Sequence, residues 1–352
     1  MRWLLAALGL TMAGLALLVW LIPAAPMTGD GQYYIQFVRN GLHHGASSWH
    51  ERRLLGPLIV TALPMDALDG FFVLTCVSLA VTALLTWLAA RELLPNEEPR
   101  ALIAIPLMFG TWLVAPNLRE FGLIDPLAWV FVAAVWLATI RRQWALAAVI
   151  AAVGVVAKEI VVLAALAAAA AAFDPRRPWV AVGVAAPAIV IAVGLTIIFP
   201  GSGTDAAAYV FKWVRDGLFS NGVARAVFLL FASYGALWLL IPRAWPLLPP
   251  HLARAEVVYV AAAVALPLVG SPERMEEAIF PLVISSALLA TRAWNLPMVW
   301  ALAVGNALFV ARVGGDARIP ALVGWAGLAV ACVLALSTYL PAQLPLRRQL
   351  AR

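Results

Sequence analysis

The stretch WLLAALGLTMAGLALLVWLIP, residues 3–23, contains no charged side chain and is long enough to cross a lipid bilayer as a helix. Comparable apolar runs recur along the 352 residues, of which 64% are hydrophobic and 12% charged, and the mean hydropathy is +0.93. An ordinary soluble domain cannot bury so much apolar surface, so the composition indicates a protein whose solvent is the membrane. The first run is longer than the apolar region of a secretory signal, and we expect it to be an uncleaved span.

The apolar runs lack the alternation that marks the strands of a membrane barrel, and a spanning backbone must satisfy its own hydrogen bonds. We therefore predict an all-α, polytopic transmembrane protein with about 10–12 spans, forming a single transmembrane domain over residues 1–352 without a separate soluble domain. Within 144–173 we expect two short helices that meet at Lys158 and Glu159, in preference to one long tilted helix. The expected spans lie near 3–23, 70–91, 101–115, 123–140, 144–157, 160–173, 178–199, 223–242, 255–270, 278–291, 296–312 and 320–341.

The first extracytoplasmic loop, residues 24–69, has the pattern of amphipathic helices that lie in the membrane interface. A second helix is expected over residues 49–63, and the segment 200–222 alternates aromatic and charged residues in a similar way. The first of the amphipathic helices in this loop lies near residues 32–42 and has an apolar and a polar side. The apolar side contains Tyr33, Tyr34, Phe37, Val38 and Leu42, and the polar side contains Gln32, Gln36, Arg39 and Asn40.

Charged residues fall in the gaps between the apolar runs, at the ends of the expected spans, and these gaps are of two kinds. One kind is short and mostly basic, at Arg141-Arg142, Arg176-Arg177 and Arg347-Arg348, as is typical of cytoplasmic loops. The other kind holds most of the acidic residues together with cations, and we expect it on the extracytoplasmic side. The net charge of +6 comes from arginines at helix ends that face anionic lipid. We therefore expect the lipid bilayer as a partner and no nucleic acid.

Asp30, which directly follows the first span, is the candidate catalytic residue. It lies between Gly29 and Gly31 and is followed by Tyr33 and Tyr34. A carboxylate at the start of a helix is also a good N-cap and is favoured by the helix dipole. That structural alternative does not account for the flanking glycines, which allow close backbone approach, or for the two tyrosines.

Arg52 and Arg53 are candidates for binding a phosphate, which a guanidinium group suits in shape and charge. The alternative is that they anchor the chain at the lipid headgroups. Adjacent arginines on a helix point to different sides, however, so a shared anchoring stripe is unfavourable.

Three further charged groups lie at the same predicted face. Lys158-Glu159 interrupts two apolar helices and serves either a functional site or a structural clamp, because unpartnered charges there cost several kcal/mol. Arg119, Glu120 and Asp125 lie at one turn, where Asp125 could instead cap a helix. Glu273 and Arg274 belong to a mixed-charge segment that also contains Glu276 and Glu277 and could be a solvated rim.

Other chemistries find little support. Adjacent histidines on a helix diverge and no cysteine joins them, so His43, His44 and His50 are not expected to hold zinc. Cys76 and Cys332 lie in apolar runs and are expected to act as small hydrophobic residues without a disulfide. The sequence contains no phosphate-binding Walker loop, nucleophile elbow or zincin motif.

In their order along the chain, several short motifs resemble the GT-C class of integral membrane glycosyltransferases, which use polyprenyl-phosphate sugars. The resemblance extends to about residue 290. Many members carry a paired acid in the first loop, whereas here Gly31 follows Asp30. The matching motifs are Asp30-Gly31-Gln32-Tyr33-Tyr34, Arg53-Leu54-Leu55-Gly56-Pro57-Leu58, Arg119 to Asp125-Pro126, Ala157-Lys158-Glu159, and Pro272-Glu273-Arg274 up to Phe280-Pro281.

The resemblance implies an enzyme of a bacterial plasma membrane that transfers a sugar from a polyprenyl-phosphate donor, with inversion, to a hydroxyl of a glycan, lipid or protein outside the cytoplasm. Asp30 would be the base. No cofactor would be required, although Asp30 would be the ligand of a divalent ion, Mg²⁺ or Mn²⁺, if one took part. The donor phosphate would be bound by Arg52, Arg53, Lys158 and Arg274, with Tyr33, Tyr34, Arg119, Glu120, Asp125, Glu159 and Glu273 in supporting positions.

Two other functions fit parts of the pattern. A transporter or flippase of a lipid-linked or anionic solute would place ionisable groups near the bilayer midplane and would show paired repeats, neither of which the sequence displays. A catalytically silent relative that binds lipid-linked sugar would keep the cations and the fold. Asp30→Asn distinguishes the enzyme from the silent binder.

Overall fold

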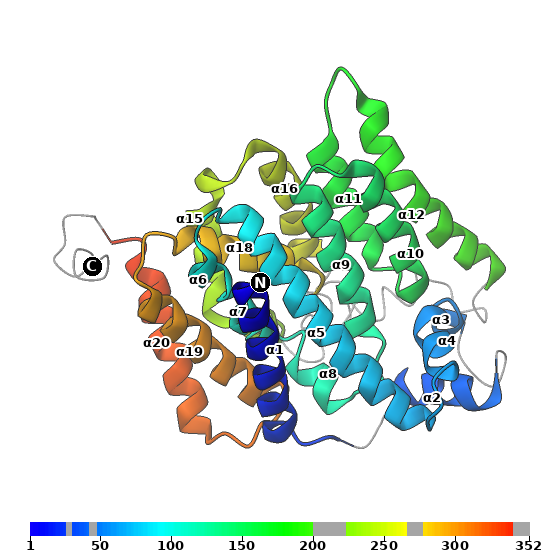
Figure 1. Cartoon of the computed structure of the whole chain (residues 1–352), viewed down its shortest axis with the longest axis horizontal. Coiled ribbons are helices and arrows are strands. Elements are labelled where there is room, and N and C mark those ends of the chain that lie inside the picture. Colours follow the sequence, from blue (N-terminus) through cyan, green and yellow to red (C-terminus); the bar gives the residue numbers. More distant parts are fainter. Residues whose placement is uncertain (26–29, 42–47, 200–222, 266–276, 341–352) are drawn as a thin grey trace.

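The structure is a computed structural model that describes residues 1–25, 30–41, 48–199, 223–265 and 277–340. These residues form helices and turns, and no strand occurs among them (Figure 1). Four helices are long and apolar enough to cross a membrane. They are α1 (Arg2–Leu21), α5 (Ala67–Leu93), α12 (Pro178–Ile198) and α19 (Leu296–Gly314). The predicted all-α class is therefore confirmed for the described residues.

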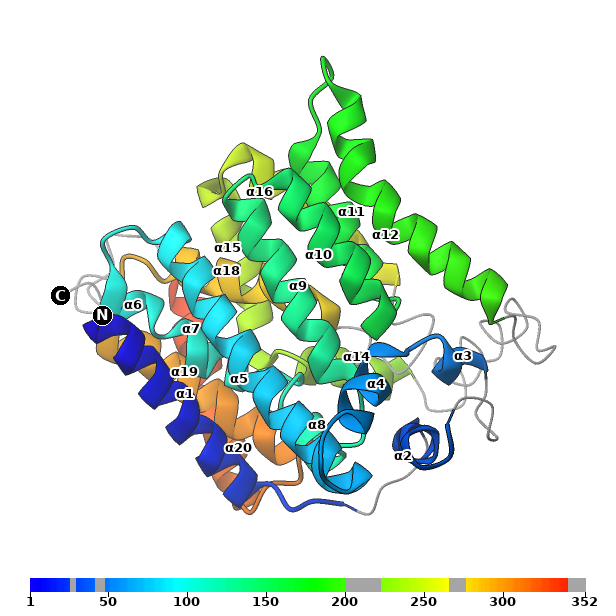
Figure 2. The ribbon, with the colours of Figure 1, turned by 45° about the vertical axis from the view of Figure 1, so that its right-hand side comes forward.

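Helices α9 to α12 form one group of packed helices that cross in alternating directions (Figures 1 and 2). Helix α9 spans Asp125–Ile140, α10 spans Trp144–Ala157 and α11 spans Val161–Ala172. The last two are separate helices joined by the turn at residues 158–160, as predicted. The alanine-rich face of α11 is buried, because small side chains let neighbouring helices approach closely. The turn at 158–160 therefore lies at the tip of a short helical hairpin.

Helix α5 runs through the protein and defines its two ends. Its first residues pack against the helices that follow α1, and we call this the loop end. Its last residues lie beside α6 (Glu98–Ala101) and the start of α1, and we call this the α6 end (Figure 2). Helix α9 begins at the loop end and finishes at the α6 end, so Asp125 and the tip of the α10–α11 hairpin share the loop end.

The first loop contains α2 (Asp30–Asn40), which begins at Asp30 as expected. Its amphipathic pattern is confirmed: Tyr34 and Phe37 are buried, whereas Gln36 and Arg39 are exposed. The prediction of one helix over 49–63 is wrong. The structure has α3 (Ser48–Glu51) and α4 (Leu55–Thr61), and residues 52–54 between them leave the helical path.

Two predicted spans are broken into short pieces, so the predictions of single helices over 101–115 and 223–242 are wrong. In the first segment, Pro106 lies in the first turn of α7, where it cannot continue a preceding helix, and α7 ends with Gly110 as its C-cap. Asn306 of α19 satisfies backbone groups in both, since its Nδ2 donates to the Gly110 carbonyl at 2.9 Å and its Oδ1 accepts from the Ala236 N–H at 2.9 Å. The pieces are α7 (Ala104–Phe109) and α8 (Ala115–Arg119), then α14 (Val223–Ala232), η2 (Gly235–Leu240) and α15 (Ile241–Ala244).

The remaining elements complete the bundle. Helix α16 starts at Pro250, five residues before the predicted span 255–270, and the structure describes it as far as Ala265. The pair α19 and α20 packs so closely that a Cβ on Gly305 would lie 2.6 Å from the Gly327 carbonyl oxygen. These elements are η3 (Trp245–Leu247), α16 (Pro250–Ala265), η5 (Glu277–Ile279), α18 (Phe280–Ala290) and α20 (Ala321–Ser337).

Candidate functional site

A buried ion pair joins the tip of the α10–α11 hairpin to the start of α9. Lys158 Nζ contacts Asp125 Oδ1, and the two side chains are only 7% and 3% exposed. Asp125 is therefore held by a cation at the N-terminus of its helix, and the helix cap is formed by Ile124 instead. The ammonium group also lies 5.6 Å from the centre of the Trp129 ring, close enough for a cation–π contact. Burial of this kind is unfavourable unless both charges are well partnered, as they are here.

A second ion pair connects the first loop to the same hairpin tip. Arg53 Nε donates to Glu159 Oε2 at 3.0 Å, Arg53 Nη2 pairs with Glu159 Oε1, and Arg53 Nη1 donates to the Tyr34 hydroxyl at 3.1 Å. Residues 52–54 are not helical, and this break lets the Arg53 side chain reach Glu159. Lys158 and Glu159 are thus neighbours in sequence whose ion pairs connect to different segments, Lys158 to Asp125 and Glu159 to Arg53.

The ion pair sets the ionisation of its members. Burial opposes ionisation of Glu159, but Arg53 and then Lys158 outweigh it and lower the pKa of the carboxyl to about 2. Burial also lowers the pKa of Arg53, but the Tyr34 and Glu159 oxygens outweigh that effect and raise it above the ordinary value. Burial raises the pKa of the Tyr34 hydroxyl to about 12 against the opposing effect of Arg53. At neutral pH, Glu159 and Arg53 are therefore charged and Tyr34 is neutral.

The third feature is a pair formed by Asp30 and His50. His50 Nε2 lies 3.1 Å from Asp30 Oδ1, and because an ionised carboxylate only accepts hydrogen bonds, Nε2 carries the proton. The imidazole packs against Tyr33 and Tyr34, with ring centres at 4.5 and 5.3 Å. In the sequence, His50 stands out only together with His43 and His44, as a conceivable zinc ligand. No local pattern around His50 indicates that it pairs with Asp30.

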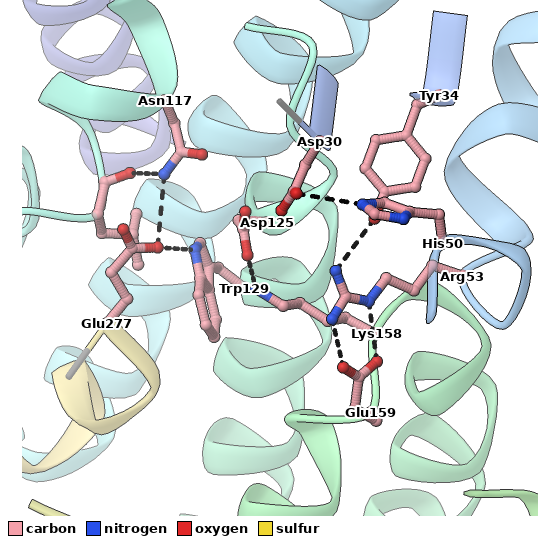
Figure 3. Close-up of polar contacts among 11 residues, drawn as sticks. Asp30, Tyr34, His50, Arg53, Asn117, Asp125, Trp129, Lys158, Glu159 and Glu277 are labelled. Atoms are coloured by element: carbon pink, nitrogen blue, oxygen red, sulfur yellow. Dashed lines mark hydrogen bonds and ion pairs between the residues drawn. The ribbon is translucent and has the colours of Figure 1, made fainter. Parts of the chain in front are cut away.

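These contacts bring segments that are far apart in the sequence to one place at the loop end (Figure 3). A small apolar cluster lies among them, in which Ile124 precedes Asp125, Ala157 precedes Lys158, and Tyr34 is itself a member. Packing in this cluster holds the backbone next to Asp125 and Lys158 in place. Of the predicted site residues, the structure joins Asp30, Tyr33, Tyr34, Arg53, Asp125, Lys158 and Glu159 in this arrangement, which we call the loop-end site.

Other predicted residues take different positions. Arg52 Nε donates to the carbonyl of Phe199 at the end of α12, at 3.0 Å, so its side chain takes a different direction from that of Arg53. Arg119 lies 3.8 Å from Asp316, and its backbone carbonyl accepts from Ala25. No contact between Glu120 and the loop-end site is found in the described part of the chain. Glu273, Arg274, His43 and His44 lie outside the described residues.

Glu277 belongs to the mixed-charge segment but was not among the predicted site residues. The solvated-rim interpretation is wrong for this residue, since it is only 2% exposed. Its Oε2 accepts from Trp129 Nε1 at 2.9 Å and from Asn117 Nδ2 at 3.5 Å. Trp129 thus lies between the Glu277 carboxylate and the Lys158 ammonium (Figure 3). The available sequence signal was its place directly before the apolar Ala278.

Glu256 departs from the expectation that ionisable groups lie at the ends of spans. It lies on the buried face of α16 and has no exposed surface. Within the described ranges, neither of its carboxylate oxygens has a hydrogen-bond partner. One turn further on, Tyr259 packs edge-on against Trp136 of α9. A buried acid in an apolar helix is by default a candidate functional group.

The described side chains do not suit a protein-held divalent ion. Among residues the structure describes, no three histidine, cysteine, aspartate or glutamate side chains come together. Asp30 and His50 form a pair, whereas Asp125 and Glu159 are already neutralised by cations. Mg²⁺ is commonly held by one or two carboxylates together with the phosphates of a substrate, so an ion at Asp30 would need the donor phosphate as a further ligand. The reaction proposed for this site is derived from the protein side chains alone.

No protein-family model matches the chain, and no curated protein matches it in sequence. An all-helical fold is shared by proteins of many functions. Function is therefore inferred from the chemistry of the loop-end site.

Proposed function

We propose that the protein is a membrane glycosyltransferase of the GT-C type, which transfers a sugar from a polyprenyl-phosphate donor to an acceptor hydroxyl. The observation that supports this most strongly is the meeting of a carboxylate, Asp30, with the cations of Arg53 and Lys158 at one end of an apolar helix bundle. A donor of this kind keeps its prenyl tail in the bilayer and its phosphate at the interface, where these groups lie.

The two cations keep capacity for a phosphate although each is paired with an acid. A guanidinium has five N–H donors, and Glu159 and Tyr34 take three of those of Arg53. The pairing holds Arg53 in place before the donor arrives, which lowers the entropy lost on binding. In the transition state, the remaining donors of Arg53 and the Lys158 ammonium stabilise the negative charge that develops on the leaving phosphate.

Asp30 is the general base of the proposed reaction. The acceptor oxygen forms a bond to the anomeric carbon, and the bond from that carbon to the phosphate oxygen breaks. The phosphate leaves with the electron pair, and the acceptor's hydroxyl proton passes to the Asp30 carboxylate. Attack from the side opposite the phosphate inverts the anomeric centre. The N–H of His50 holds Asp30 in position.

The sidedness of the site is part of the proposal. With the N-terminus in the cytoplasm, α1 brings the following loop to the extracytoplasmic side of a bacterial plasma membrane. The chain would then cross with about 10–12 spans, several of them short or broken. The acceptor is a hydroxyl of a glycan, lipid or protein that is reached from this side.

The test is transfer by the full-length protein in lipid nanodiscs, measured with radiolabelled polyprenyl-phosphate hexoses and pentoses. We expect Asp30→Asn to lower turnover by about 10²–10⁴-fold, the range for loss of a general base. The matched control is Asp66→Asn, since Asp66 is an exposed acid of the same loop that caps α5, a role Asn also fills. Equal turnover in wild type and Asp30→Asn would exclude the proposed base. Donor binding without turnover in the wild type would identify a silent binder.

One observation favours a transporter as the second candidate function. Glu256 is buried within α16 and lacks a hydrogen-bond partner among the described residues, a setting common for proton-coupling acids. In liposomes without an acceptor, a flippase would move a fluorescent polyprenyl-phosphate sugar between leaflets and would lose this activity in Glu256→Gln. The glycosyltransferase would show no such movement, and Glu256→Gln would retain sugar transfer.

A further inference from the structure

A cavity of about 500 Å³ lies at the α6 end, opposite the loop-end site. Its walls come from α15, η3, the last turn of α18 and the end of α20, which meet at this end of the bundle (Figure 1). Neither the proposed reaction nor the transporter alternative uses it. Both charged and apolar side chains line it, among them Arg243, Arg292, Trp294, Leu247 and Leu289.

The polar side of the cavity is positively charged. Arg243 is exposed and has no ion pair among the described side chains. Arg292 uses its Nε to pair with Glu97 Oε1 at 2.7 Å, so its terminal nitrogens remain available. Glu97 is shared with Arg100, at 3.0 Å. Two guanidinium groups, those of Arg243 and Arg292, line the cavity, and no carboxylate is among its described lining residues; this positive charge favours an anion.

Backbone carbonyls at the end of α18 would repel an anion, but they are occupied. Arg100 Nη1 donates to the Thr291 carbonyl at 2.9 Å, and Arg100 Nη2 donates to the Trp294 carbonyl at 2.8 Å. The negative end of this helix is thereby neutralised at the cavity wall.

The apolar side of the cavity continues onto the surface of the protein. Leu247, which lines it, is 54% exposed, and the neighbouring Trp245 is 36% exposed. Exposed tryptophan and leucine beside arginine are typical of a surface at the level of lipid headgroups. A ligand that fits both sides has an anionic head and an apolar tail.

We propose that this cavity binds the phosphate group of an anionic phospholipid, with the headgroup between Arg243 and Arg292 and an acyl chain along Leu247. A soluble phosphate ester would share the headgroup contact but would leave the apolar wall without a partner. The proposal does not depend on the reaction at the loop-end site.

The experiment measures lipid binding to the purified full-length protein in a nonionic detergent, by native mass spectrometry. The probes are phosphatidylglycerol, phosphatidylcholine and glycerol 3-phosphate. For the wild type, we expect phosphatidylglycerol to bind at least about tenfold more tightly than phosphatidylcholine. Arg243→Ala should remove about tenfold of that affinity, the loss expected for one charge-assisted contact. The control is Arg177→Ala, an exposed arginine directly before α12 that does not line the cavity, which should change the affinity less than twofold.

Three results would overturn the proposal. Equal binding of the two phospholipids would show that the cavity does not select an anionic head. Equal losses in Arg243→Ala and Arg177→Ala would show a diffuse charge effect rather than a site. Glycerol 3-phosphate that binds as tightly as phosphatidylglycerol would assign the cavity to a soluble phosphate ester.

Discussion

Both ends of the helix bundle carry ion pairs, but among the described residues a pair with both side chains buried, Lys158–Asp125, is found only at the loop end. At the loop end, Lys158 and Asp125 are 7% and 3% exposed, and Arg53 is 14% exposed although its partner Glu159 is 42% exposed. At the α6 end, the paired side chains are between 14% and 54% exposed. Those pairs are Arg91–Glu98, Arg100–Glu97, Arg141–Glu92 and Arg292–Glu97.

The difference separates two uses of charge in a membrane protein. An exposed pair contributes about 0–1 kcal/mol and serves topology and solubility. Two buried charges, in contrast, lose their hydration. The free energy gained from their mutual attraction often does no more than offset this desolvation cost. A buried pair is therefore poor evidence of stabilisation for its own sake. Its presence at the loop end, beside Asp30, fits a site that holds charge in a defined position for a ligand.

The largest effect is expected for Lys158→Met, which leaves the Asp125 carboxylate buried without its cation. Unfolding free energy should fall by about 3–5 kcal/mol, measured by thermal or SDS-induced unfolding in detergent. The double variant Lys158→Met/Asp125→Leu should recover most of the stability, because both buried charges are gone, but none of the sugar transfer.

The control for this comparison is Arg141→Gln, which breaks an exposed pair at the α6 end. If Lys158→Met proved as stable as Arg141→Gln, the loop-end pair would not be buried in solution. Recovery of transfer by the apolar double variant would show that neither charge takes part in the reaction.

An intermediate effect is expected for Arg53→Lys, which keeps the charge but loses the two-nitrogen contact with Glu159 and the bond to Tyr34. Donor affinity should fall by roughly tenfold, as for one charge-assisted hydrogen bond, measured with a labelled donor in nanodiscs. Arg39→Lys alters an exposed pair of the same loop and should leave the affinity unchanged. Similar affinities for Arg53→Lys and wild type would exclude the guanidinium from donor binding.

A smaller effect follows from the low pKa of Glu159. Its folded pKa of about 2 lies below the ordinary 4.5, so the ion pair stabilises the fold above pH 4.5 and this contribution is lost as the pH falls towards 2. The stability difference between wild type and Glu159→Gln should therefore shrink between pH 5 and pH 3, measured by thermal unfolding. If the stability difference between wild type and Glu159→Gln stayed constant from pH 5 to pH 3, the lowered pKa of Glu159 would be contradicted.

The smallest effect is expected at the α6 end. Glu92→Gln removes the partner of Arg141, and because both side chains are more than a third exposed, the unfolding free energy should change by less than about 1 kcal/mol. Sugar transfer should be unchanged. A loss as large as that of Lys158→Met would remove the contrast between the two ends.

Local features of the fold could be predicted from the sequence because they depend on neighbouring residues. The start of α2 at Asp30, its amphipathic faces and the hairpin at Lys158 all follow from short patterns of charge and hydropathy. The breaks at residues 110–114 and 233–234 do not, because Asn306, from a distant helix, supplies the hydrogen bonds that make them stable.

The membership of the site could be predicted only in part for the same reason. Asp30, Arg53 and Lys158 stand out as charges beside apolar runs, but their partners are set by tertiary packing. The sequence does not show that Lys158 pairs with Asp125 rather than with its neighbour Glu159. Nor does it distinguish the buried Glu277 from the acids that precede it in the chain.

The most direct test of the account is a structure of the full-length protein in a nanodisc with a non-hydrolysable polyprenyl-phosphonate sugar. We predict that the phosphonate oxygens lie about 3 Å from Arg53 and Lys158 nitrogens, with the anomeric carbon facing Asp30. An analogue bound elsewhere, with Arg53 and Lys158 still engaged only by Glu159 and Asp125, would contradict the proposed glycosyl transfer at this site.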